Sequence, residues 1–264
     1  MAEPFRFNPS RSFQFEGRSV LVTGGGSGIG AAVAQAFGAS GAKVAVHYSR
    51  NRNGAEAVAE SIRHAGGTAL TLGGDLQDRS VANPLVDKTV QAFGGLDILV
   101  NNAGDMFGRR PMELASDEDY DRVMGLNVHA AFAICRAAAP VMRAARRGSM
   151  INTTSIAART GGGDGVGLYG SAKAFVSTMT RVFAREMAPH GVRVNGVAPG
   201  VILTDFHVRN STPEQLEGAR KSIPMGRTGR PDDCVGAYLF LADETLSGYI
   251  TGQIIEVNGG QYMP

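Results

Sequence analysis

The chain has 264 residues, of which 43% are hydrophobic and 19% charged, so one α/β domain with a sizeable core can account for its length. A formal net charge of +2 argues against a nucleic-acid-binding surface. Prolines and arginines interrupt the amino-terminal segment, so we expect no signal peptide, no membrane contact and a cytoplasmic location. The two cysteines, Cys135 and Cys234, lie in apolar helical patterns and are expected to be buried free thiols.

From residue 18 onward, short β-branched runs alternate with longer helical patterns. The expected strands cover residues 19–23, 43–48, 69–72, 97–101, 149–154, 193–198 and 253–257. The expected helices cover residues 28–40, 55–65, 80–93, 118–146, 169–188 and 231–241. This alternation predicts an α/β fold, in which a Rossmann-type doubly wound parallel sheet carries helices on both faces of a single domain, 18–264. Residues 1–17 are interpreted as an N-terminal arm that packs on its own subunit or on a partner subunit.

A glycine-rich turn separates the first expected strand from the first expected helix. Glycines allow a tight turn and close approach of the backbone to a phosphate, and the helix amino terminus favours an anion. A flexible glycine loop is the alternative, but the position between strand and helix favours a dinucleotide site. The predicted cofactor contacts in this turn are Gly24, Gly26, Ser27, Gly28, Ile29 and Gly30.

The end of the second expected strand bears on the choice of cofactor. An acidic residue about 20 positions beyond the glycines is typical of NAD sites, whereas an arginine serves the 2′-phosphate of NADP. Tyr48, Ser49 and Arg50 occur here, and no carboxylate lies between Gly30 and Glu56. Arg50 could instead be a solvated loop charge. We favour NADP as the cofactor, with NAD possible.

Tyr169 and Lys173 form a potential proton-transfer pair. They are four residues apart, which places them on one face of a helix, and Ser155 lies fourteen residues upstream. A nearby ammonium favours the phenolate, so we expect the Tyr169 pKa to be lowered toward the range of a useful acid or base. A Tyr-x-x-x-Lys pair alone is a weak signal, because both residue types are common on helix surfaces.

These patterns occur together in an order that resembles the short-chain dehydrogenase/reductase family, in its compact branch of about 250 residues. The motifs that carry the resemblance are Thr23-Gly-Gly-Gly-Ser-Gly-Ile-Gly30, Asn101-Asn-Ala-Gly104, Asn127, Ser155, Tyr169-x-x-x-Lys173, Pro199-Gly200 and Thr204. The general similarity is to 3-oxoacyl-carrier-protein reductases. An enoyl reductase is disfavoured, because that branch spaces its tyrosine and lysine more widely.

The resemblance implies a role for each of four catalytic side chains. Tyr169 would give a proton to the carbonyl oxygen as hydride arrives, and Ser155 would hold that oxygen by a hydrogen bond. Lys173 would lower the Tyr169 pKa and bind the nicotinamide ribose. Asn127 would hold a water that links Lys173 to solvent; its alternative role is a helix contact whose hydrogen bonds are all satisfied.

The resemblance also implies cofactor contacts beyond the glycine turn. Asp75 would meet the adenine edge, although a turn-forming aspartate is the alternative there. The other implied contacts are Leu76, Asn102, Ala103, Gly104, Tyr169, Lys173, Pro199, Gly200, Ile202 and Thr204.

The hypothesis that follows is an NAD(P)-dependent oxidoreductase acting on a ketone or secondary alcohol, with a non-catalytic NADP-binding scaffold or sensor as the alternative. The five histidines show no metal-ligand spacing, so we expect no metal. The family resemblance implies a homotetramer built on helices 118–146 and 169–188.

The substrate itself stays open at this level. We expect a lid at about residues 201–230, and the glycine-rich stretch 161–167 leaves the shape of the substrate mouth undefined. Arg109, Arg110 and Arg209 could receive an acidic carrier, or could simply be solvated. The candidate walls are Met106, Phe107, Ile156, Phe206, His207, Leu216, Ile223 and Met225.

Overall fold

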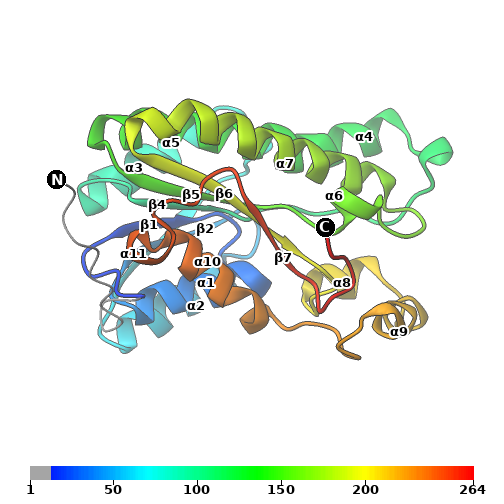
Figure 1. Ribbon diagram of the computed structural model, residues 1–264. Coiled ribbons are helices and arrows are strands. Elements are labelled where there is room, and N and C mark those ends of the chain that lie inside the picture. The colour runs from blue at the N-terminus through cyan, green and yellow to red at the C-terminus, as the bar shows by residue number, and fades with distance from the viewer. Residues whose placement is uncertain (1–12) are drawn as a thin grey trace.

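One parallel sheet organises the chain, as the computed structural model of residues 13–264 shows (Figure 1). Its seven strands follow the spatial order β3-β2-β1-β4-β5-β6-β7. Their bounds are β1 (Ser19–Val22), β2 (Lys43–Tyr48), β3 (Thr68–Gly73), β4 (Ile98–Asn101), β5 (Gly148–Thr153), β6 (Val192–Pro199) and β7 (Ile254–Val257). Every pair of neighbours is parallel, so the carboxyl ends of all strands lie at one edge. This confirms the doubly wound α/β fold, whose ligand crevice opens where β1 and β4 adjoin.

Helices cover both faces of the sheet (Figure 1). The main ones are α1 (Gly28–Ala39), α2 (Arg52–His64), α3 (Ala82–Phe93), α4 (Asp117–Met124), α5 (Ala130–Ala145), α7 (Gly167–Met187) and α10 (Pro231–Ala242). The remaining α-helices are α6 (Ala157–Thr160), α8 (Asp205–Asn210), α9 (Pro213–Ser222) and α11 (Glu244–Ser247). Among residues 13–264, no helix combines the length and hydropathy that a membrane span needs.

Two apolar layers hold the helices to the sheet. Successive strand residues point to opposite faces, so Val20 and Val22 of β1 pack with α1, α2 and α10, whereas Leu21 packs with α3, α5 and α7. Both faces of the sheet are covered, which explains why β1 is apolar from Val20 to Val22 and β4 from Ile98 to Val100.

The helix expected over residues 118–146 is interrupted. A π-helical turn, Gly125–His129, separates α4 from α5 and carries Asn127. The Asn127 amide donates to the carbonyl oxygens of Val123 and Asp105, at 2.9 and 2.7 Å. Single π turns inside α-helices occur frequently at functional sites, and here the turn directs a buried amide toward the loop after β4.

Of the expected N-terminal arm, residues 1–12 lie outside the described residues. Phe15 is buried, and its ring meets that of Phe37 at a centroid distance of 5.0 Å. The described end of the arm therefore packs on its own subunit.

Candidate active site

A cavity of about 1110 Å³ lies at the carboxyl ends of the strands. The predicted catalytic side chains Ser155, Tyr169 and Lys173 all line it. The predicted cofactor residues in its wall are Gly24, Gly26, Ser27, Gly28, Ile29, Tyr48, Ser49, Arg50, Leu76, Asn102, Ala103, Gly104, Tyr169, Lys173, Pro199, Gly200, Ile202 and Thr204. The fold therefore gathers residues from the carboxyl ends of six strands, β1 to β6, and from α7 around one space.

Three predicted residues lie outside the cavity wall. Gly30 stands behind the glycine turn, where a β-carbon would collide with the carbonyl oxygen of Gly24. Asp75 is exposed, and its carboxylate accepts a hydrogen bond of 3.0 Å from the Gln77 amide, which is the turn-forming alternative. Its predicted adenine contact stays a prediction. Asn127 is fully buried behind Gly104.

The glycine turn presents the amino terminus of α1 to the cavity. Ser27, the N-cap residue, makes no side-chain capping bond, so the first-turn N–H groups have no side-chain partner there. Gly28 has a φ of +54°, in the left-handed region that glycine tolerates best. A phosphate fits this arrangement, because the N–H groups and the helix dipole both favour an anion.

His47, in the neighbouring strand β2, supports this turn. The sequence analysis assigned it no such role. Its Nδ1 accepts a hydrogen bond of 3.2 Å from the Gly24 N–H, and its Nε2 lies 2.9 Å from the Gly74 carbonyl oxygen. Since Nδ1 accepts, Nε2 carries the proton and donates. Burial lowers the His47 pKa, consistent with this neutral form. The only sequence signal was a polar residue inside an otherwise apolar strand.

The Tyr169 pKa moves opposite to the expected direction. Burial raises it, because the phenolate loses hydration, and the charge of Asp105 raises it further. A hydrogen bond with Ser155 lowers it by less. The Lys173 Nζ lies 5.7 Å from the Tyr169 ring centroid, yet the ammonium does not reverse the effect of burial. The expectation of a lowered pKa is thus wrong for this structure, and Tyr169 holds its proton at neutral pH.

Lys173 is buried, and its ammonium donates to the Thr153 carbonyl oxygen at 3.0 Å. Burial lowers its pKa to about 8. The Asn127 Oδ1 is buried and has no hydrogen-bond partner among the described residues. A β-carbon on Gly104 would lie 2.7 Å from that oxygen and 3.0 Å from the Lys173 Nζ, so both polar atoms border the same small space. An acceptor and a donor placed in this way suit a bridging water.

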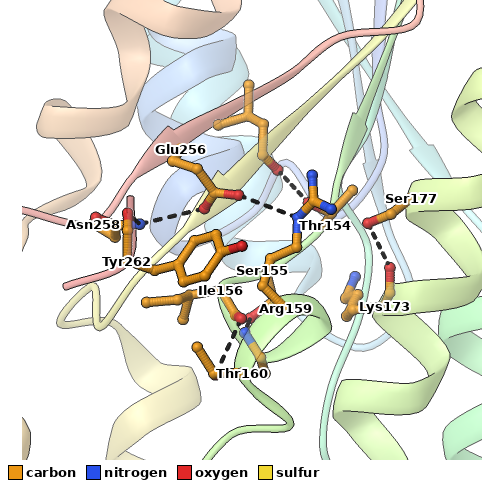
Figure 2. Close-up of polar contacts among 12 residues, drawn as sticks. Thr154, Ser155, Ile156, Arg159, Thr160, Lys173, Ser177, Glu256, Asn258 and Tyr262 are labelled. Atoms are coloured by element: carbon orange, nitrogen blue, oxygen red, sulfur yellow. Dashed lines mark hydrogen bonds and ion pairs between the residues drawn. The ribbon is translucent and has the colours of Figure 1, made fainter. Parts of the chain in front are cut away.

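Ser155 stands at the end of β5, where the chain enters α6. Its Oγ accepts a hydrogen bond of 3.1 Å from the Ala157 amide. Figure 2 shows Arg159 extending from α6 toward Glu256 at the end of β7, with Nε 3.6 Å from Oε1. Asn258 donates to the other oxygen of Glu256 at 3.3 Å. These contacts hold the segment that follows Ser155 against the sheet.

The walls of the substrate end differ in part from those expected. Met106, Ile156, Phe206 and His207 line the cavity, and the rings of Tyr169 and Phe206 meet at a centroid distance of 5.5 Å. Four other candidates do not line it: Phe107, Leu216, Ile223 and Met225. Helix α9 instead presents one face, whose lining residues are Gln215, Gly218, Ala219 and Ser222. Leu216 is off this face, since helix positions i, i+3, i+4 and i+7 share one side.

Arg109 closes the mouth on the side of the glycine-rich loop. Its guanidinium donates to the carbonyl oxygens of Asn210 and Asp164, at 2.8 and 3.0 Å, and to the Ser211 hydroxyl at 3.4 Å. Arg109 is therefore not a solvated loop charge, which was one of its two alternatives. It joins the end of α8 to the loop before α7, although 101 residues separate Arg109 from Asn210.

The chain is similar to known proteins over most of its length. A family model described as enoyl-(acyl carrier protein) reductase matches residues 24–261. The 3-oxoacyl-[acyl-carrier-protein] reductase of Synechocystis sp. is 37% identical over 243 residues, which are 92% of this chain and 96% of that protein.

Solved structures superpose over nearly the whole chain. The NADH-dependent reductase A1-R′ complexed with NAD has a TM-score of 0.85 and 36% identity, covering 95% of this chain and 98% of that one. The 7α-hydroxysteroid dehydrogenase complexed with NADH and 7-oxo glycochenodeoxycholic acid has a TM-score of 0.90 and 33% identity, covering 98% and 100%. Both are proteins that this chain is similar to in sequence and in fold.

Proposed function

The chain belongs to the short-chain dehydrogenase/reductase family, and on that premise we propose that it transfers hydride between a nicotinamide cofactor and a ketone or secondary alcohol. One observation carries the proposal: Ser155, Tyr169 and Lys173 meet in the same cavity as the amino terminus of α1. A phosphate site and a proton donor in one cavity are what such a reaction needs.

In the reduction direction, the residues of the glycine turn and Lys173 would hold the nicotinamide cofactor, which when bound would supply the hydride for the carbonyl carbon. Tyr169 then gives its proton to the carbonyl oxygen, and Ser155 donates a hydrogen bond to that oxygen. The raised pKa keeps Tyr169 protonated, so the proton to be donated is present, but it also makes the phenol a weaker acid than a pKa near neutrality would. Lys173 and the Asn127 oxygen border a space in which a water can return the proton. In oxidation, the same groups act in reverse, with Tyr169 as the base.

We propose NADP as the preferred cofactor. Ser49 and Arg50 are exposed at the cavity rim after β2, where a guanidinium can pair with a 2′-phosphate. No carboxylate side chain belongs to that part of the wall among residues 47–51. The two solved relatives named above hold NAD or NADH, so NAD is the competing cofactor.

The test is Tyr169→Phe, measured with a panel of ketones and acyl thioesters and with each cofactor. We expect turnover to fall by about 10³-fold or more while cofactor affinity is kept, because only the proton donor is removed. Tyr120→Phe, on the exposed surface of α4, is the matched control. Near-full activity of Tyr169→Phe would overturn the assignment.

The alternative of a non-catalytic NADP-binding sensor is less well supported, because Asn127, Ser155, Tyr169 and Lys173 are all retained. The same panel distinguishes the two: tight cofactor binding without oxidation of the cofactor by any carbonyl would favour the sensor. The similarity to 3-oxoacyl-carrier-protein reductases makes 3-oxoacyl thioesters the first substrates to include. The spacing of four residues between Tyr169 and Lys173 favours a carbonyl reductase over an enoyl reductase.

We also propose that the chain forms a homotetramer through α5 and α7, which lie side by side on one face (Figure 1). Phe132, Phe175 and Val182 on these helices are 41%, 45% and 50% exposed, so these helices offer apolar side chains to a partner subunit. A monomeric mass in light scattering would contradict this.

The free thiols of Cys135 and Cys234 suit the reducing cytoplasm, where we expect the protein to act.

A further inference from the structure

Asp105 is a charged residue of the cavity wall to which the proposed reaction assigns no role. It follows Gly104 directly, and its side chain is 9% exposed. A buried carboxylate is costly unless other groups pair with it. Its partners therefore indicate what it does.

The side chain of Asp105 binds the lid. Its Oδ2 lies 2.9 Å from the Arg209 Nη2, and its Oδ1 accepts from the Asn210 amide at 3.0 Å. Both partners belong to α8. Oδ1 also accepts from the backbone amides of Met106 and Phe107, at 2.7 and 3.3 Å, which fixes the carboxylate in one orientation.

The backbone of Asp105 binds the catalytic centre. Its carbonyl oxygen accepts the 2.7 Å hydrogen bond from the Asn127 amide. The Oδ1 of the same Asn127 side chain borders the space beside Gly104, and the Lys173 Nζ borders that space too. One residue thus contacts α8 with its side chain and the catalytic asparagine with its backbone.

We infer that Asp105 is a positioning residue that couples the lid helix α8 to the catalytic side chains. With α8 in place, Arg209 pairs with the Asp105 carboxylate beside Tyr169 and offsets part of its charge. When α8 leaves, the full negative charge opposes formation of the phenolate more strongly, so Tyr169 acts as a base more readily beneath a seated α8. The inference rests on the proposed function, because it concerns the proton that Tyr169 exchanges.

The charged surroundings of Tyr169 are compatible with this assignment. Lys173 on its own helix, Ser155 after β5, Asp105 after β4 and Tyr238 on α10 interact with Tyr169. The other ionisable residues in this part of the cavity wall are Arg109, Asp164, Asp205, His207 and Arg209. Burial and the charge of Arg109 lower the His207 pKa to about 4, so His207 is neutral near and above pH 7. Lys173 titrates within the range of interest but is common to all the variants below. Differences between variants therefore report Asp105 and Arg209.

The first measurement is the pH profile of secondary-alcohol oxidation. Asp105→Asn keeps an acceptor oxygen and removes the charge. We therefore expect the midpoint, the pH at which the oxidation rate is half of its maximum, to fall by ~0.5–1 pH unit. Arg209→Gln leaves Asp105 unpaired, and we expect a rise of similar size. Arg220→Gln is the matched control, because Arg220 pairs with Glu217 on the outer side of α9, and its midpoint should equal that of the wild type.

The double variant separates coupling from two independent charges. If Asp105 positions Arg209, the shift caused by Arg209→Gln should shrink to about half or less in the Asp105→Asn background. An equal shift in both backgrounds would overturn the inference, and so would unchanged midpoints in the single variants. A wild type that oxidises no alcohol with either cofactor would instead count against the proposed function.

Hydrogen exchange tests the lid contact without turnover. Amides of residues 205–211 should exchange several-fold faster in Asp105→Ala than in the wild type, whereas Arg220→Gln should match the wild type. Melting temperatures confirm that each variant is folded. Unchanged exchange in folded Asp105→Ala would show that Asp105 does not hold α8, which would refute the coupling.

Discussion

The imidazole of His47 connects two loops at the carboxyl edge of the sheet: Nδ1 accepts from the Gly24 amide at 3.2 Å, and Nε2 donates to the Gly74 carbonyl at 2.9 Å. Gly24 begins the turn that presents α1 to the cavity. The geometry of the phosphate site therefore depends on a side chain that does not itself belong to the glycine turn.

Replacing His47 should weaken cofactor binding without touching the catalytic groups. His47→Phe fills a similar volume but leaves the Gly24 amide and the Gly74 carbonyl without this partner, which costs about 1–3 kcal/mol when such groups are buried. We expect the Kd for the cofactor to rise about tenfold, measured by calorimetric titration. His64→Phe, at an exposed position on α2, is the control. Equal affinity of His47→Phe and the wild type would show that the turn holds its shape unaided.

Much of the site follows from local sequence because parallel strands bring distant segments to one edge. The glycine turn, Asn102 and Ser155 each come directly after an expected strand, so predicting the strands was sufficient to place them together. Tyr169 and Lys173 were placed on one helix face because positions i and i+4 of a helix lie on the same side. The strand ends and the helix face follow from the local periodicity of the chain, whereas the roles expected of Asn102 and Ser155 came from the family resemblance.

Burial and tertiary pairing were not visible in the same way. The direction of the Tyr169 pKa depends on hydration lost inside the folded cavity, which exceeds the effect of the lysine four residues away. The pairing of Asp105 with Arg209 joins residues 104 positions apart and has no local signature. The π turn at Asn127 carries a side-chain amide that donates to the carbonyl oxygen of Asp105, 22 residues away in the sequence, and this contact too is made only in the fold.

Arg109 should govern the substrate mouth more than the chemical step. Arg109→Ala removes hydrogen bonds to Asn210, Asp164 and Ser211 and frees the lid from the glycine-rich loop. We expect KM for the carbonyl substrate to rise about tenfold with a smaller change in kcat, since uniform binding is lost. Steady-state kinetics on the best ketone measure both constants. The control is Arg110→Ala, whose exposed side chain pairs with Asp119 instead; a comparable rise in KM there would remove the special role of Arg109.

Arg50 should set the choice between NADPH and NADH. A charge-assisted pair with the 2′-phosphate contributes about 1.5–3 kcal/mol, so Arg50→Ala should raise KM for NADPH roughly tenfold to a hundredfold. KM for NADH, which lacks that phosphate, should change little. Arg52→Ala serves as the control, because Arg52 faces Glu56 on α2 with an N–O distance of 3.9 Å. A proportional loss with both cofactors would mean that Arg50 does not contact the 2′-phosphate.

The buried Lys173 should leave a signature in the pH dependence of stability. Its pKa is lowered from 10.5 to about 8 in the folded protein, because burial disfavours the ammonium. Between these values the unfolded chain binds the extra proton, so this group makes the free energy of unfolding rise with pH, by up to about 1.4 kcal/mol per pH unit. Below pH 8 both states are protonated, and the full cost of burying the charge is present.

Lys173→Met removes that cost, so its stability advantage over the wild type should be largest near pH 7 and should narrow toward pH 10. Urea unfolding at pH 7, 8, 9 and 10 measures the difference, with Lys221→Met on the exposed side of α9 as the control. A gap that stays constant across this range would mean that Lys173 keeps its proton in the folded protein.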